Sequence, residues 1–210
     1  MSDRNNQDKS TMLNRRRFVS VAALALLAAP QTAMADLTDA AASFVDKVLK
    51  DLSGIVNGGK PVPEQQAALR RIVLDNVDVD GVARFCLGRF WRTATPDQQK
   101  NYLEAFRTVL VANITGKVGE YKGVTFSVGR AQKREEDVIV ASVVSRPSNA
   151  PNKVDWLVST VGGATKVIDV IAEGTSLRLT QRGDYAAFLG RNNNDISALI
   201  EAMKKQTSPA

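Results

Sequence analysis

The spacing of apolar residues changes twice along this chain, and that change limits the folds it can adopt. Apolar residues recur at helical spacing over about residues 38–121 and again over about 176–205. Between these stretches, about residues 123–174 are rich in Val and Ile and alternate with a period of two. Helices, then a run of strands, then helices predict an α+β fold, with an antiparallel sheet of about four strands and helices around it.

Turn and capping residues divide the helical stretches. The first helix, over 38–57, ends at Gly58-Gly59, and two more are expected over 64–76 and 79–91. Thr95-Pro96-Asp97-Gln98 then starts a long helix, because Thr95 is a good N-cap and Gln98 completes a capping box. Its apolar stripe extends toward Tyr121 and contains Tyr102, Phe106, Val109, Leu110 and Ile114. Two final helices are expected over 176–190 and 195–205.

Four segments carry the strand pattern, and turn residues separate them. They are GVTFSVG (123–129), DVIVASVVS (137–145), KVDWLVSTV (153–161) and KVIDVIAEG (166–174). Gly162-Gly163 makes the third and fourth segments a hairpin.

Both faces of the predicted sheet carry apolar residues. One face would present Phe126, Val140 and Trp156, but Leu157 and Val161 point the other way and are apolar too. Such a sheet needs cover on both sides, or one face lines a cavity. Periodicity alone favours an ordinary core over a cavity.

The N-terminal residues have the organisation of an export signal. Arg15 to Arg17 precede an apolar run, Phe18 to Ala29, that is too short to span a bilayer. Ala33-Met34-Ala35 then supplies the small residues of an A-x-A cleavage site, which places cleavage before Asp36. A buried core helix is the alternative. Residues 14–19 also fit the twin-arginine pattern, with an ordinary secretory signal as the alternative route. We therefore expect residues 1–35 to be removed and 36–210 to form one domain in the periplasm.

The composition excludes several classes of function. The chain has no histidine, so Ser-His-Asp triads, Cys-His dyads and most zinc sites cannot form. Cys86 is the single cysteine, and its apolar neighbours indicate a buried structural thiol in preference to a reactive one. The formal net charge is +6, but the basic residues are scattered without an aromatic stripe, so nucleic-acid binding is not expected. We expect a protein that is not an enzyme and needs no metal or cofactor.

Two blocks of sequence resemble those of a known family. Residues 83–110 contain the pattern L-G-x-x-W-x-x-A-T-P-x-Q, and residues 167–189 contain D-x-I-x-E-G-x-S, with KVDW (153–156) between them. In this order the blocks resemble the MlaC family of periplasmic phospholipid-binding proteins, also called the toluene-tolerance family. The resemblance spans about residues 38–205, nearly the whole chain after the export signal. Hopanoid-associated relatives share much of the pattern.

The resemblance implies a fold and a function. The fold is a curved antiparallel sheet with helices around it, and lipid tails insert between sheet and helices. The function is to carry phospholipid, bound as cargo, between an outer-membrane lipoprotein-porin complex and an inner-membrane ABC transporter, which maintains outer-membrane lipid asymmetry. The alternatives are a hopanoid-associated carrier of the same family and a ligand-free adaptor of the transporter. We expect a monomer.

The cavity that the resemblance implies predicts which side chains contact lipid tails. Residues at alternate positions of neighbouring strands share a sheet face, and residues of one helical stripe share a helix face. On this basis the tail-contacting set is Phe106, Leu110 and Tyr121 from the long helix and Phe126, Val140, Trp156, Val158 and Val170 from the strands. The choice of sheet face is the step that periodicity does not decide.

Overall fold

The computed structural model describes residues 29–147 and 149–207, and the side chains from residue 37 onward. Its elements are the helices α1 (Ala29–Asn57), α2 (Val62–Asn76), α3 (Val79–Leu87), α4 (Pro96–Thr115), α5 (Leu177–Arg191) and α6 (Ile196–Thr207), the 3-10 helices η1 (Gly88–Arg92) and η2 (Val118–Tyr121), and the strands β1 (Thr125–Arg134), β2 (Asp137–Ser145), β3 (Asn152–Val161), β4 (Ala164–Ala172) and β5 (Thr175–Ser176). This is the α+β architecture expected from the change of period.

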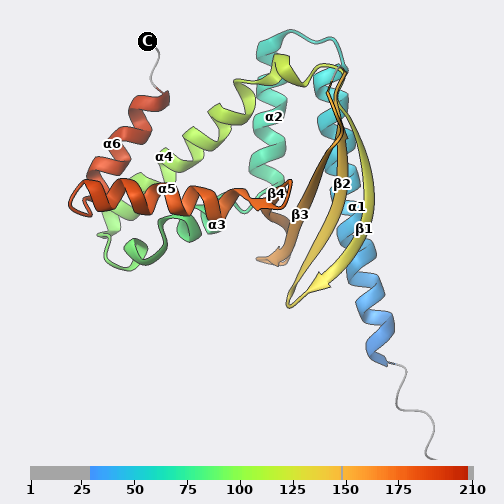
Figure 1. Ribbon diagram of the computed structural model, residues 1–210, viewed down its shortest axis with the longest axis horizontal. Helices are drawn as coiled ribbons and strands as arrows, with labels where there is room; N and C mark the ends of the chain where they lie inside the picture. Colours follow the sequence, from blue (N-terminus) through green and yellow to red (C-terminus); the bar gives the residue numbers. More distant parts are fainter. Residues whose placement is uncertain (1–28, 148, 208–210) are drawn as a thin grey trace, which may run out of the picture.

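The strands form one open antiparallel sheet in the order β1-β2-β3-β4-β5. The expectation of about four strands is confirmed, with β5 as a two-residue addition. Register shifts between Val128 and Ala131 and between Leu157 and Val158 interrupt the regular pairing. Figure 1 shows the long strands bending, so the sheet has a concave face. Gly162 and Gly163 have φ of 58° and 80°, as the predicted β3–β4 hairpin requires.

The helix α1 covers one end of the concave face. Ala41, Val45 and Leu49 are buried and pack in one apolar cluster with residues of β2 and β3. Asn57 fastens the end of α1 to the start of the sheet. Its side chain accepts from the Gly123 N–H at 2.7 Å and donates to the Val124 carbonyl at 3.0 Å. Figure 1 shows α1 running along β1.

The other helices pack on one another in a second core, which α3, α4, α5 and α6 share. At its centre Tyr102 is fully buried and donates to the Ala83 carbonyl at 2.8 Å, with the Phe106 and Tyr185 rings beside it. The capping box predicted at Thr95 and Gln98 is present and starts α4. Together these contacts fix the long α4 opposite the sheet.

Two helix ends differ from expectation. The helix expected over 79–91 ends at Leu87, because Gly88 adopts a φ of 61°, and a 3-10 turn follows. The helix expected to extend toward Tyr121 ends at Thr115, with Gly116 as its C-cap, and Tyr121 lies in η2. Among the described residues, no helix has the length and hydropathy needed to cross a membrane.

Helix α2 lies between the two cores and is tied to both. The Gln66 side chain donates to the Thr115 carbonyl at the end of α4, at 3.3 Å. At the other end of α2, Lys166 of β4 donates to the Asp75 carbonyl, and the Asp78 N–H donates to the Val167 carbonyl at 3.0 Å. The helical core is thereby held at a distance from the sheet, and a cavity remains between them.

Candidate functional site

An apolar cavity of about 840 Å³ lies between the concave face of the sheet and the helices. Its volume falls in the upper part of the range of small-molecule sites, about 300–1,000 Å³. Helices α1 to α5 and strands β1 to β4 all contribute to its lining. The apolar lining residues are Val48, Leu52, Val56, Leu69, Ile72, Val73, Val77, Val82, Phe106, Leu110, Ile114, Tyr121, Val124, Phe126, Val144, Val154, Trp156, Val167, Ile168, Val170 and Leu177.

Six of the eight side chains predicted to contact lipid tails line this cavity. They are Phe106 and Leu110 from α4, Tyr121 from η2, Phe126 from β1, Trp156 from β3 and Val170 from β4. The strand register explains why the three strand residues meet. Phe126 pairs with Val144, and Trp156 pairs with Val170, so their side chains share one face. Whether these residues contact lipid stays a prediction.

The structure places the other two, Val140 and Val158, outside the cavity lining. They lie on the same face, since Val140 is opposite Trp156 in the register. Both are buried, with 0% and 2% of their surface exposed, and they pack with Val45 and Leu49 of α1. Alternation identifies the face of a strand, but it does not show where a helix covers that face. The two valines therefore belong to the core beneath α1.

Trp156 is held in the cavity wall by hydrogen bonds to the neighbouring strand. Its Nε1 donates to Ser142 Oγ at 2.9 Å, and Ser142 Oγ donates to the Val154 carbonyl at 2.9 Å. Ser142 is 3% exposed, so this pairing satisfies a polar group that would otherwise be buried without a partner. The indole can therefore present its apolar rings to the cavity with its polar atom occupied.

The walls formed by α1 and α2 were not predicted as part of the site. Val48, Leu52 and Val56 line the cavity from α1, and Leu69, Ile72 and Val73 line it from α2. In the sequence these residues appear as ordinary helical stripes, the pattern of any helix packed on a core. Nothing in that pattern distinguishes a residue facing a cavity from a residue facing another side chain.

Solvent-exposed lining residues mark the rim of the cavity. We call this set the rim: Asn113, Lys117, Arg146, Leu177, Thr180 and Asp184. It connects the end of α4 and the end of β2 with the first turns of α5. Tyr121 lies on the same side, where burial raises the pKa of its phenol and Arg146 partly offsets that rise. The site thus combines an apolar interior with a mixed-charge opening, an arrangement suited to a molecule with apolar tails and a polar head.

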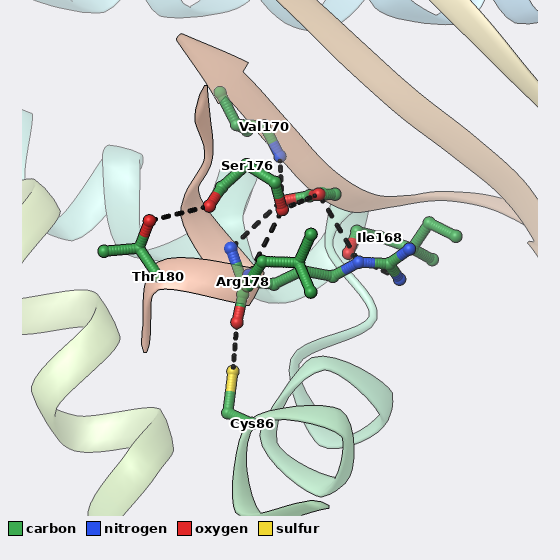
Figure 2. Close-up of polar contacts among 8 residues, drawn as sticks. Cys86, Ile168, Val170, Ser176, Arg178 and Thr180 are labelled. Atoms are coloured by element: carbon green, nitrogen blue, oxygen red, sulfur yellow. Dashed lines mark hydrogen bonds and ion pairs between the residues drawn. The ribbon is translucent and has the colours of Figure 1, made fainter. Parts of the chain in front are cut away.

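The buried carboxylate of Asp169 joins the sheet to α5 beside the cavity, and Figure 2 labels its partners Val170, Ser176 and Arg178. Asp169 Oδ1 accepts from the N–H groups of Val170 at 2.8 Å and Arg178 at 3.1 Å. Its Oδ2 accepts from Ser176 Oγ at 2.5 Å and lies 3.4 Å from Arg178 Nε. Ser176 Oγ also accepts from the Leu179 N–H at 3.1 Å and so caps α5. The block D-x-I-x-E-G-x-S therefore places the first turn of α5 against β4.

Glu173 and Gly174 of the same block form the turn between β4 and β5. Their φ values are 48° and 80°, in the left-handed region that glycine adopts readily. The Glu173 carboxylate accepts from the Lys153 N–H at 2.6 Å, and its own N–H donates to the Lys153 carbonyl at 3.0 Å. These bonds hold the turn on the neighbouring strand β3, which fixes where α5 begins.

Cys86 is a buried thiol, as its apolar neighbours indicated. It is 2% exposed and lies 3.6 Å from the Arg178 carbonyl, to which its Sγ donates (Figure 2). The pKa of the Cys86 thiol is raised to about 12, chiefly by burial and also by Asp169, while Arg178 and Arg182 act to lower it. The thiol is therefore protonated at neutral pH.

Among the described residues, no group of three or more His, Cys, Asp or Glu side chains is placed to hold a metal ion. Asp169 is engaged by four partners, and the rest of the cavity interior is predominantly apolar. What this arrangement offers a ligand is burial of apolar surface.

Comparisons with known proteins agree with this geometry. Residues 42–205 match the family model described as MlaC protein. A toluene tolerance protein, ttg2D of Pseudomonas putida, is 27% identical over 146 residues, which cover 68% of this chain and 67% of that protein. A phospholipid-binding protein from Ralstonia solanacearum, solved in complex with a phospholipid, has a similar fold. Its TM-score is 0.68 at 20% identity, over 80% of this chain and 96% of that one. Since the family model spans most of the described residues, the chain belongs to the MlaC family.

Proposed function

We propose that this protein binds a phospholipid in the cavity and carries it across the periplasm, between an outer-membrane lipoprotein-porin complex and an inner-membrane ABC transporter. The transport would maintain outer-membrane lipid asymmetry. Membership of the MlaC family supports the proposal, as does the phospholipid bound to the Ralstonia solanacearum protein of similar fold.

The observation that carries the proposal is the apolar cavity itself. A free phospholipid exposes on the order of 30 methylenes, each worth about 0.8 kcal/mol on leaving water. A carrier must therefore shield the tails throughout the crossing. Transfer from a membrane into an apolar cavity moves the tails between two apolar surroundings. The free energies of burying the tails in the two places are therefore nearly equal, and their difference is small. Loading and release are then both feasible without covalent chemistry.

The cavity also bears on the choice between a phospholipid carrier and the alternative functions. A ligand-free adaptor has no need for an apolar space of about 840 Å³, so the cavity favours a carrier. A hopanoid-associated carrier would use a similar space for a rigid polycyclic lipid. The absence of histidine supports a carrier in preference to an enzyme that acts on lipid.

We further propose that the chain reaches the periplasm by removal of residues 1–35 through the twin-arginine route. The cleavage point before Asp36 falls within α1, whose bounds are Ala29–Asn57. Among the residues whose side chains are described, the first buried residue of α1 is Ala41. Cleavage there would leave in place every α1 residue with a described side chain that packs on the sheet.

A two-vesicle transfer assay tests the function. The purified protein is incubated with donor vesicles that contain a labelled phospholipid and with unlabelled acceptor vesicles. We expect the label to move to the acceptors as intact phospholipid, faster than without protein. Donors labelled with a hopanoid provide the comparison for the alternative cargo. No acceleration would contradict the carrier, and release of free fatty acid above a heat-denatured control would show that the protein is an enzyme.

A further inference from the structure

Two exposed leucines bracket Arg178 in the first turn of α5. Leu177 is 51% exposed and Leu179 is 58% exposed, values that are high for large apolar side chains. Successive residues of a helix are about 100° apart, so the two leucines lie at opposite edges of the exposed face of α5, with the exposed Thr180 and Gly183 between them. Leu177 shares the cavity side with Thr180, Gln181 and Asp184, all of which line the cavity. Leu179 points away from the cavity, on the side where Arg182 follows three positions later.

Arg182 follows Leu179 on α5, and aromatic rings hold Arg182 and the neighbouring arginines in place. The Arg178 and Arg182 guanidiniums lie 4.4 and 5.1 Å from the centre of the Phe85 ring. Arg182 passes over Gly88, where a Cβ atom would come within 3.1 Å of its Nε. The next residue, Arg89, lies 4.9 Å over Phe90.

The positive charges of Arg89 and Arg182 can interact with a binding partner. Within the described part of the chain, Arg89 and Arg182 form no salt bridge. A guanidinium stacked on a ring keeps its full charge and its N–H donors at the edge. Asp184, the carboxylate of this part of the rim, is seven positions from Leu177 and lies on the Leu177 edge of α5, away from Arg182.

We propose that Leu177, Leu179, Arg89 and Arg182 form a membrane-docking surface that seats the cavity rim on an anionic phospholipid bilayer. We call these four residues the docking surface. This inference rests on the proposed function. The leucines would insert among the acyl chains, and the arginines would pair with lipid phosphates, which the guanidinium fork matches.

The position of Leu177 favours a bilayer over a protein as the occupant. Leu177 belongs both to the exposed docking surface and to the cavity lining. A tail that leaves the membrane beside Leu177 passes an apolar side chain on its way into the cavity, which lowers the cost of its exposure to water. Isolated exposed leucines beside arginines suit a fluid apolar phase beneath a layer of phosphates.

Vesicle flotation with matched variants tests the docking surface. The vesicles are either pure phosphatidylcholine or a mixture with phosphatidylglycerol. We expect the unaltered protein to float with the mixed vesicles, and less so when salt is raised. Leu179→Gln should weaken that binding about tenfold, since it removes most of a leucine's transfer free energy. Arg182→Gln should weaken it about fivefold, the factor expected for one basic residue near an anionic surface.

Equivalent changes on α2 serve as controls. Val62 is 51% exposed and Arg71 is exposed, and Val62 begins α2 at the end of the molecule where α1 ends (Figure 1). Val62→Gln and Arg71→Gln should bind vesicles as the unaltered protein does, and far-UV circular dichroism should be the same for all four variants. Unchanged flotation of Leu179→Gln and Arg182→Gln would overturn the proposal, as would equal losses in the α2 controls.

Lipid analysis of the same preparations separates this proposal from the carrier function. Phospholipid bound to every variant, together with unaffected flotation, would disprove docking through this surface and leave the carrier function standing. If Leu179→Gln and Arg182→Gln float normally but transfer phospholipid poorly when another protein is present, the surface binds a protein partner. That result would overturn the membrane assignment. If no preparation carries phospholipid, the carrier function itself fails.

Discussion

Asp169 shows how a single residue can fix one wall of the cavity. Its side chain is 4% exposed, its oxygens accept hydrogen bonds from the Val170 and Arg178 N–H groups and the Ser176 hydroxyl, and it forms an ion pair with the Arg178 guanidinium. No other side chain of this size can accept all these hydrogen bonds and also carry the negative charge. An amide in its place would turn an NH2 group toward a donor and would leave the partly buried Arg178 charge without a counter-ion.

We expect Asp169→Asn to lower the free energy of unfolding by about 3 kcal/mol, the range seen when one partner of a buried ion pair is removed. Asp80→Asn provides the control, because the Asp80–Arg107 pair is about 40% exposed on each side and should cost less than about 1 kcal/mol. Urea unfolding followed by circular dichroism measures both. Equal shifts of the two midpoints would contradict a structural role for the Asp169 contacts.

The buried thiol gives a second test at the residue scale. Burial raises the pKa of Cys86 from 9.0 to about 12, so at pH 8 the thiolate is about a thousandfold scarcer than in an exposed thiol. Alkylation by iodoacetamide should be slower than in urea by at least that factor. Because the folded pKa is raised, the associated stability is present below about pH 9 and is lost as the pH rises toward 12. Rapid labelling of the folded protein would show that Cys86 is accessible and ionised.

At the scale of elements, helix α1 decides which part of the concave face is core and which part is cavity. Val140 and Val158 are buried under α1, whereas Phe126 and Trp156 border that cluster and, with Val144, also line the cavity. One strand, β2, thus contributes to the core at one end and to the cavity at the other.

The position of α1 predicts that the same substitution has different effects on the two faces of β2. Val140→Asp should prevent folding, because a carboxylate at a fully buried position costs several kcal/mol. Val143→Asp is the control, since Val143 is 38% exposed and lies opposite Lys153. Yield of soluble protein and far-UV circular dichroism measure the difference. A folded Val140→Asp variant that lacks only its lipid would show that this part of the face belongs to the cavity after all.

The elements themselves could be predicted from the sequence where local signals are strong. The expected strand over 137–145 coincides with β2, and the capping box places the start of α4 correctly, because period two and N-capping depend on neighbouring residues. The cavity could be predicted only in part. Phe126, Trp156 and Val170 line the cavity from the expected face, but the roles of α1 and α2 depend on how distant segments pack. Local periodicity carries no information about that packing.

For the whole molecule, the division into a sheet with α1 and a helical core explains how an apolar space persists inside a stable fold. Each part has its own buried apolar cluster, and α2 is hydrogen-bonded to α4 at one end and to β4 at the other. The protein can therefore keep a cavity without losing the packing that stabilises it, which the proposed carrier needs in order to exist both loaded and empty.

Export of the whole molecule can be tested by intact mass. We expect the periplasmic form to begin at Asp36, because the A-x-A site and the positive segment before it have the order of a cleaved signal. Replacing Arg15 and Arg16 by Lys should block export through the twin-arginine route. A periplasmic protein that retains residues 1–35 would disprove the cleavage, and unchanged export of the double variant would indicate the general secretory route.

The most direct test of the central claim is the phospholipid content of the purified protein and of two variants on one helix, measured by native mass spectrometry. Leu110 lines the cavity from α4, and Ala112, two positions later, is exposed. The unaltered protein and Ala112→Asp should carry phospholipid. Leu110→Asp should be folded but empty, because a carboxylate among the tails costs several kcal/mol to desolvate. If Leu110→Asp carries as much phospholipid as Ala112→Asp, or if the unaltered protein carries none, the cavity is not the lipid site.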